Sequence, residues 1–229
     1  MKVKWSGIGM IEGSGKLQGT VMFKGRSGAF ARVNVKGVNP RTNSQIARRA
    51  VLSTQSQAWR GLTAAQRAAW NAAAASGAFP QTNALGVTYN PTGAQLFVRL
   101  NINILLAGGS AITAPPVKPS LTQVLLTTLT AADATPALSL AFSGTLGASE
   151  ALLISATGNL SPGVSRPGKS QYRFLEAYTS TSAADILTSF QAIYGDPVET
   201  QKIFVSAVIV DDTSGVTAQA GTVSAIVAT

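Results

Sequence analysis

Residues 39–71 have the sequence NPRTNSQIARRAVLSTQSQAWRGLTAAQRAAWN, which predicts two consecutive helices. Thr42 and Gln45 have the spacing of a capping box, and Thr63 and Gln66 repeat it. Apolar residues follow the first cap at helical spacing, in a stripe of Ala47, Val51, Ala58 and Leu62 with Ile46 and Trp59 beside it. Gly77 offers a C-terminal cap. We therefore expect a helical hairpin over about residues 43–60 and 64–75.

The same stretch contains five arginines, two tryptophans and no acid. Guanidinium groups neutralise phosphates, but they also bind carboxylates on neighbouring proteins, so the charge alone leaves both partners open. Trp59 and Trp70 lie on the apolar side of short helices, which favours core packing over stacking on bases.

Charge is distributed unevenly along the 229 residues. Residues 1–100 carry thirteen Lys/Arg and one acid, Glu12, whereas residues 101–229 carry five Lys/Arg and eight acids. This asymmetry indicates an anionic partner for the N-terminal part. The chain has no histidine and no cysteine, which removes the commonest general base, thiol nucleophiles and Cys-based zinc sites. We expect a protein that is not an enzyme, with no catalytic, cofactor-binding or metal-binding residue.

Residues 1–38 are rich in glycine and alternate with period two, which predicts a hairpin of two strands joined at the sequence KGRSG, residues 24–28. Such a ribbon is marginal alone, so it must pack on something else. Its lysines and arginines make it a basic arm. Neither a signal peptide nor a membrane span is predicted, because no apolar run is long enough.

The C-terminal part begins after a proline-rich linker, residues 114–119. Before this linker, residues 93–107 favour a helix with a Leu96, Leu100 and Ile104 stripe. After it, six β-branched runs separated by turn residues predict an immunoglobulin-like β-sandwich over residues 120–229, with a short helix inserted in residues 182–195. The expected fold is α+β, divided into a basic arm (1–38), a helical anchoring module (39–113), the linker (114–119) and the sandwich (120–229).

Two short motifs suggest chemistry that the surrounding residues do not support. Gly15-Lys16 resembles the end of a phosphate-binding loop, but Met10 and Leu17 stand where that motif needs glycine and Ser/Thr. Asp211 and Asp212 have the oxygen ligands of a cation site, yet their sequence favours solvated residues of a hairpin turn.

The N-terminal hundred residues resemble a family of phage and prophage virion structural proteins. The motifs that carry the resemblance are SGKLQGTVMFKGRSGAFAR (14–32), VNPRT (38–42), QAWRGLTAAQRAAWN (57–71) and GAQLFVRLN (93–101), in this order. The stretch from Trp59 to Trp70 is also similar to a short part of HMG boxes, which we interpret as convergence on a capped helical hairpin. The family resemblance implies a virion component with a β-rich C-terminal domain.

We therefore expect a structural protein of a bacteriophage particle, either capsid-associated or in the tail, made in the host cytoplasm and located in the virion. It would assemble with copies of itself and other virion proteins, with no membrane partner. A DNA-packing protein that uses the helical hairpin is the alternative, and a carbohydrate-binding sandwich is a third hypothesis. The candidate partner-binding residues, for protein or DNA, are Lys16, Lys24, Arg26, Arg32, Lys36, Arg41, Arg48, Arg49, Arg60 and Arg67.

Overall fold

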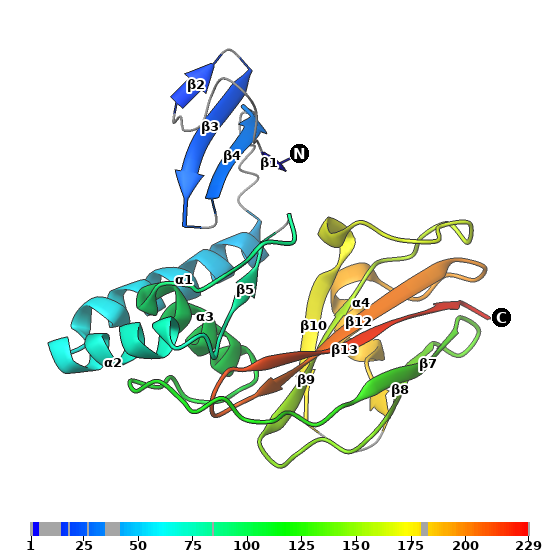
Figure 1. The fold of residues 1–229 in the computed structure, drawn as a ribbon. Coiled ribbons are helices and arrows are strands. Elements are labelled where there is room, and N and C mark those ends of the chain that lie inside the picture. Colours follow the sequence, from blue (N-terminus) through cyan, green and yellow to red (C-terminus); the bar gives the residue numbers. More distant parts are fainter. Residues whose placement is uncertain are drawn as a thin grey trace. The chain divides into compact units, whose positions relative to one another are not determined.

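The computed structural model describes residues 2–4, 15–17, 19–26, 28–34, 42–83, 85–179 and 183–228. It has a mixed α+β fold, as the sequence predicts, with helices and antiparallel sheets (Figure 1). The chain divides into two compact units. The first comprises residues 1–98 and 113–115, and the second comprises residues 99–112 and 116–229.

The expected N-terminal hairpin is present as strands β3 (Thr20–Gly25) and β4 (Gly28–Val33), with Phe23 opposite Phe30. Two further strands, β1 (Lys2–Lys4) and β2 (Gly15–Leu17), extend it into a four-stranded antiparallel sheet with the order β1-β4-β3-β2. Each added strand is only three residues long, too short to show period-two alternation in sequence.

Helices α1 (Asn43–Gly61) and α2 (Ala64–Ala75) confirm the predicted helical hairpin. At α2 the capping box is complete: Gln66 N donates to Thr63 Oγ1 at 3.2 Å, and Thr63 N donates to Gln66 Oε1 at 2.9 Å. At α1 only half of it forms. Gln45 N donates to Thr42 Oγ1 at 3.3 Å, whereas the buried Gln45 Oε1 has no hydrogen-bond partner.

The buried side of α1 differs from the expected stripe. Val51 and Leu62 face inward and Trp59 lies beside them, as expected, but Gln55 also belongs to this side. Gln55 is only 5 % exposed, and its Oε1 has no hydrogen-bond partner. Ala47 and Ala58 of the expected stripe are exposed, as is Ile46, which was expected beside it. Side chains at i, i+4, i+8 and i+11 share one side of a helix, so the register of the stripe was wrong by part of a turn.

Helix α3 (Gly93–Leu106) follows a small hairpin of β5 (Gln81–Thr82) and β6 (Thr88–Tyr89) that the sequence did not suggest. The predicted stripe of Leu96, Leu100 and Ile104 is fully buried. A third capping box begins this helix: Thr92 N donates to Gln95 Oε1 at 2.9 Å, and Gln95 N donates to Thr92 Oγ1 at 3.2 Å. The division between the two units falls within α3, after Val98.

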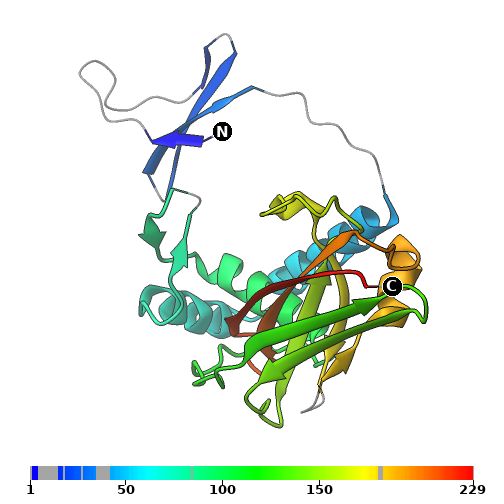
Figure 2. The ribbon, with the colours of Figure 1, turned by 90° about the vertical axis from the view of Figure 1, so that its right-hand side faces the viewer.

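The second unit contains the C-terminal strands. Their bounds are β7 (Leu125–Ala132), β8 (Ala137–Ser143), β9 (Glu150–Ala156), β10 (Arg173–Tyr178), β11 (Ala184–Asp185), β12 (Lys202–Asp211) and β13 (Thr217–Ile226). One sheet has the order β10-β9-β12-β13 and the other β11-β8-β7, and all pairs within them are antiparallel (Figure 2). Each of the six β-branched segments that the sequence predicted as strands contains one of these strands. The sequence did not predict β11.

The inserted helix is shorter than residues 182–195 suggested. Helix α4 (Leu187–Tyr194) is preceded by β11, which pairs with β8. Ile186 and Phe190 are fully buried and belong to a hydrophobic core that collects side chains from both C-terminal sheets. A short 3-10 helix, η1 (Lys169–Gln171), precedes β10.

The turn between β12 and β13 lies where the sequence predicts it, but Asp211 is not solvated. Its side chain is only 4 % exposed and accepts hydrogen bonds from Thr213 N at 3.2 Å and Thr213 Oγ1 at 2.9 Å. Ser214 Oγ also donates to it. Gly215 has φ 69°, and a Cβ there would clash with Leu100 O. The turn is therefore a packed element, and its acid is a structural acceptor.

Candidate interaction surfaces

The structure places the predicted basic residues on several elements. Lys16 belongs to β2 and Lys24 to β3, while Arg26, in the turn between β3 and β4, and Arg32, on β4, are exposed. Lys36 and Arg41 lie outside the described residues. The remaining four are exposed on the helical hairpin, with Arg48, Arg49 and Arg60 on α1 and Arg67 on α2.

The three arginines of α1 do not share one side of the helix. Arg49 and Arg60 are eleven residues apart, or about three turns, so they point to the same side, about 16 Å apart along the axis. Arg48 is rotated from Arg49 by about 100°. It lies instead in line with Leu52 and Gln55, on the side of α1 that is buried further along the helix.

Two side chains near the beginning of α1 are exposed, Leu52 at the border of the packing side and Ile46 on the opposite side of the helix. Leu52 is 49 % exposed and Ile46 is 54 % exposed, although both are large apolar residues. Around the axis, Arg48, Leu52, Arg49 and Ile46 follow one another within about 160°. We call these four residues the open end of α1. It combines two apolar side chains with two guanidinium groups.

Both tryptophans pack on Phe97 of α3. The ring centroids of Trp70 and Phe97 are 5.3 Å apart at 89°, and those of Trp59 and Phe97 are 5.6 Å apart at 52°. Trp70 is fully buried, and its Nε1 donates to Thr113 O at 2.8 Å. The interpretation of Trp70 as a core residue is confirmed, so it has no free face for a nucleic-acid base.

The second unit has a groove of about 820 Å³ on the outer face of the β10-β9-β12-β13 sheet. Ser155, Ser206 and Thr222 lie opposite one another on β9, β12 and β13, so their side chains form a polar row across the sheet. Residues 157–172, between β9 and β10, carry Ser165, Arg166 and Lys169 along its edge. We call this feature the loop-covered groove. The same sheet face is apolar at Leu153, Val208 and Val210, which pack with Ala107.

The loop of the groove is held at both of its ends by Tyr194 of α4. Tyr194 Oη donates to Ala156 O at 2.9 Å and is 3.3 Å from Gln171 O. Gly158 lets the Tyr194 ring approach, because a Cβ there would lie 2.9 Å from the ring. Further along, Lys202 Nζ donates to Val164 O at 3.3 Å.

Two aromatic residues line this groove. Tyr172 is half-buried, and burial raises the pKa of its phenol above the ordinary 10.0, although the charge of Arg166 and a hydrogen bond with Thr222 act in the opposite direction. Phe204 is 5 % exposed, and Lys202 Nζ lies 4.9 Å from its ring centroid. Cations and aromatic rings therefore occupy the same part of the groove.

Sequence reasoning missed the groove. Its polar row joins residues from three strands whose pairing no local pattern reveals. One local signal was present: residues 151–175 contain three cations and no acid, inside a C-terminal part with an excess of acids.

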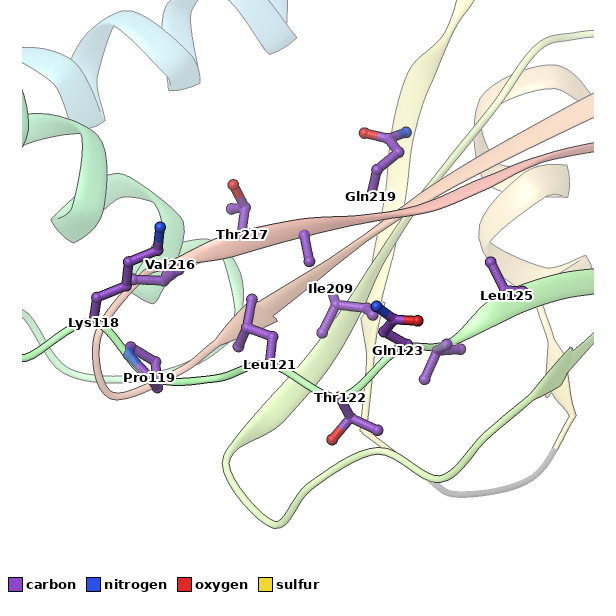
Figure 3. Close-up of a pocket in the computed structure, with 12 residues that line it drawn as sticks. Lys118, Pro119, Leu121, Thr122, Gln123, Leu125, Ile209, Val216, Thr217 and Gln219 are labelled. Atoms are coloured by element: carbon purple, nitrogen blue, oxygen red, sulfur yellow. The ribbon is translucent and has the colours of Figure 1, made fainter. Parts of the chain in front are cut away.

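A second hollow, of about 450 Å³, lies at the start of β13. Figure 3 shows Lys118, Pro119 and Leu121, from the segment before β7, near Val216 and Thr217. At the other end of these strands the two sheets are joined, since Asp133 N donates to Ala228 O and Ala228 N donates to Ala131 O, both at 3.0 Å. The hollow is a gap between strands that converge further along.

Two buried carboxylates face each other across β9 and β12, where Glu150 is paired with Asp211. Burial raises the pKa of both groups, but hydrogen bonds outweigh it, so each pKa lies below its ordinary value of 4.5 for Glu150 and 3.8 for Asp211. Glu150 accepts from Thr122 N and Gly147 N, both at 2.8 Å. Within the described part of the chain, no group of three or more Asp or Glu residues could hold a metal ion.

No protein-family model, curated protein or solved structure matches this chain. Among the described residues, no helix is long and apolar enough to cross a bilayer.

Proposed function

We propose that this protein is a non-enzymatic structural component of a bacteriophage virion, capsid-associated or in the tail, which assembles through its basic N-terminal module. The open end of α1 carries this proposal. On this 19-residue helix it presents two large apolar side chains that are about half exposed, Ile46 at 54 % and Leu52 at 49 %.

The chemistry of this surface suits a protein partner. Burying a large aliphatic side chain completely contributes about 1.5–3 kcal/mol, so covering the exposed halves of Ile46 and Leu52 would contribute roughly half of that at each residue. Arg48 and Arg49 add charge-assisted hydrogen bonds to carboxylates. A neighbouring subunit that presents apolar and acidic side chains would satisfy both requirements.

The order of the N-terminal motifs supports a virion location, because they resemble those of phage structural proteins over residues 14–101. The C-terminal sheets support a displayed domain. We propose an immunoglobulin-like sandwich for it. Its first, second and fifth strands, β7, β8 and β11, lie in one sheet, and β9, β10, β12 and β13 lie in the other.

The test compares three forms of the full chain by sedimentation velocity over a concentration series. The wild type is expected to self-associate, and Leu52→Glu is expected to abolish this association. Ile193→Glu is the matched control, because Ile193 is an apolar residue of α4 that is 43 % exposed. The variant at Ile193 should associate as the wild type does.

The virion location is tested separately by mass spectrometry of particles purified from cells that express the gene among its phage neighbours. The chain should be found in the particles, and Leu52→Glu should reduce its amount. Particles without the chain would overturn the proposal.

A DNA-packing role is the second candidate, favoured by Arg49 and Arg60 on one side of α1 and by the excess of cations in residues 1–100. Phosphate contacts would make binding of duplex DNA fall steeply with salt. Unchanged DNA affinity in an Arg49→Glu/Arg60→Glu double variant would exclude this role for the hairpin.

A further inference from the structure

We propose that the loop-covered groove binds an acidic saccharide, a sugar chain that carries carboxylate or sulfate groups. This inference rests on the second unit alone and is independent of the proposed virion role.

The distribution of charge points to an anionic ligand. Residues 101–229 carry more acids than cations, yet residues 151–175 carry three cations, Arg166, Lys169 and Arg173, and no acid. Arg166 and Lys169 line the groove directly. The chain segments that form its walls and floor, residues 151–175, 202–210 and 213–229, contain no acid. The groove is therefore positively charged, whereas the second unit as a whole has a net negative charge.

The floor of the groove points to a hydroxylated ligand. Ser155, Ser206 and Thr222 form the polar row, and Gln219 and Ser224 extend it along β13. Hydroxyl and amide side chains donate and accept hydrogen bonds, which matches sugar hydroxyls that do both. A phosphate backbone would use only the donors. The floor thus favours a saccharide over a nucleic acid.

The groove also has a suitable size and an aromatic side. Its volume of about 820 Å³ lies within the range of about 300–1,000 Å³ typical of ligand sites. Tyr172 presents a half-buried ring with a polar tip, which suits the amphipathic face of a sugar.

The loop that carries the cations is held before any ligand arrives. Its ends are joined by Tyr194, and Leu160 exchanges backbone hydrogen bonds with Lys202 at 3.0 and 2.8 Å. Gly168 N donates to Gln171 Oε1 at 2.7 Å, next to Lys169. A loop that is ordered in advance loses less conformational entropy on binding.

The experiment is calorimetric titration of the full-length protein with four probes: an alginate hexasaccharide, a heparin hexasaccharide, neutral laminarihexaose and a short DNA duplex. We expect at least one of the two acidic sugars to bind more tightly than the neutral one. Alginate binding would identify carboxylate as the recognised group, and heparin binding would identify sulfate. Arg166→Gln/Lys169→Gln should weaken this binding by about tenfold or more.

A second variant separates the saccharide from a general polyanion. Thr222→Val removes one hydroxyl, together with its hydrogen bond to Tyr172, and keeps the β-branched shape, so it should weaken sugar binding several-fold and leave DNA binding unchanged. The matched control, Arg60→Gln/Arg67→Gln, removes two exposed cations of the other unit and should not affect sugar binding. The proposal is overturned if neither acidic sugar binds more tightly than laminarihexaose, or if Thr222→Val has no effect on sugar binding.

Discussion

The helical part of the first unit and the β-sheet part of the second unit bury their apolar residues to different degrees. In the second unit Leu140, Leu152 and Ile154 are fully buried in one core, whereas α1 leaves Ile46 and Leu52 about half exposed. The two parts also differ in charge, because cations dominate residues 1–100 and acids outnumber cations in residues 101–229. One part buries its large apolar side chains in its own core, and the other leaves two of them about half exposed.

The largest effect is expected from a cavity in the C-terminal core. Leu140→Ala should lower the free energy of unfolding of the second unit by about 2–5 kcal/mol, because a fully buried side chain is removed and the site collapses only in part. Urea denaturation followed by circular dichroism measures this. A loss below about 1 kcal/mol would show that this core is loosely packed and would weaken the comparison.

The turn after β12 should be nearly as sensitive. Gly215→Ala forces a side chain into a positive φ and against Leu100 O, so we expect a loss of about 2–3 kcal/mol. Gly163→Ala is the control, because a Cβ at Gly163 meets nothing within 4 Å. Equal unfolding midpoints for the two variants would contradict the packed turn.

Acid should destabilise the second unit through Asp211 and Glu150. Because the pKa of each is lower in the folded state, their stabilisation is present above the ordinary values of 3.8 and 4.5 and is lost as the pH falls through the lowered ones. Asp211→Asn should cost about 1–3 kcal/mol at pH 7 and progressively less in acid. Melting temperatures from pH 7 to pH 3 test this, and parallel curves for variant and wild type would refute it.

The N-terminal caps of α1 and α2 should differ in how much they stabilise the first unit. Thr63→Ala removes the side chain of a complete capping box and should cost about 1 kcal/mol. Thr42→Ala removes a single bond at 3.3 Å and should cost less. The two variants are compared by following helix content during thermal unfolding. A larger loss of stability in Thr42→Ala than in Thr63→Ala would contradict the prediction.

The smallest effect on stability is expected at the open end of α1. Leu52→Ser should change the free energy of unfolding of the monomer by no more than about 0.5 kcal/mol, because the side chain is half exposed. Its association should nevertheless weaken. Denaturation at low protein concentration measures the free energy of unfolding, and sedimentation velocity measures the self-association. A monomer destabilised as strongly as by Leu140→Ala would show that Leu52 belongs to a core.

The helices were predictable because their signals are local. Thr63 and Gln66 are three residues apart, and the stripe of Leu96, Leu100 and Ile104 repeats at four, so neither depends on distant parts of the chain. The stripe of α1 was harder to place. Ala47 and Ala58 are small residues that a helix tolerates on any side, and Gln55 gave no sign that it would be buried.

The candidate sites were predictable only in part. Arg48, Arg49, Arg60 and Arg67 were found from charge, and their exposure follows from their type. The division of Arg48, Arg49 and Arg60 between different sides of α1 follows from the helix register. The loop-covered groove required the pairing of β9 with β12 and of β12 with β13, which connects residues about 50 and 16 positions apart.

By itself, the sequence determined the helical hairpin, the third helix, the positions of most strands and the separation of charge, because capping, periodicity and composition act over a few residues. Tertiary structure alone decided which side chains share a surface. It buried Asp211 and Gln55, left Leu52 exposed and aligned Ser155, Ser206 and Thr222. The physical reason is that burial and cross-strand contact depend on which distant segments pack together, and short-range patterns carry little information about that choice.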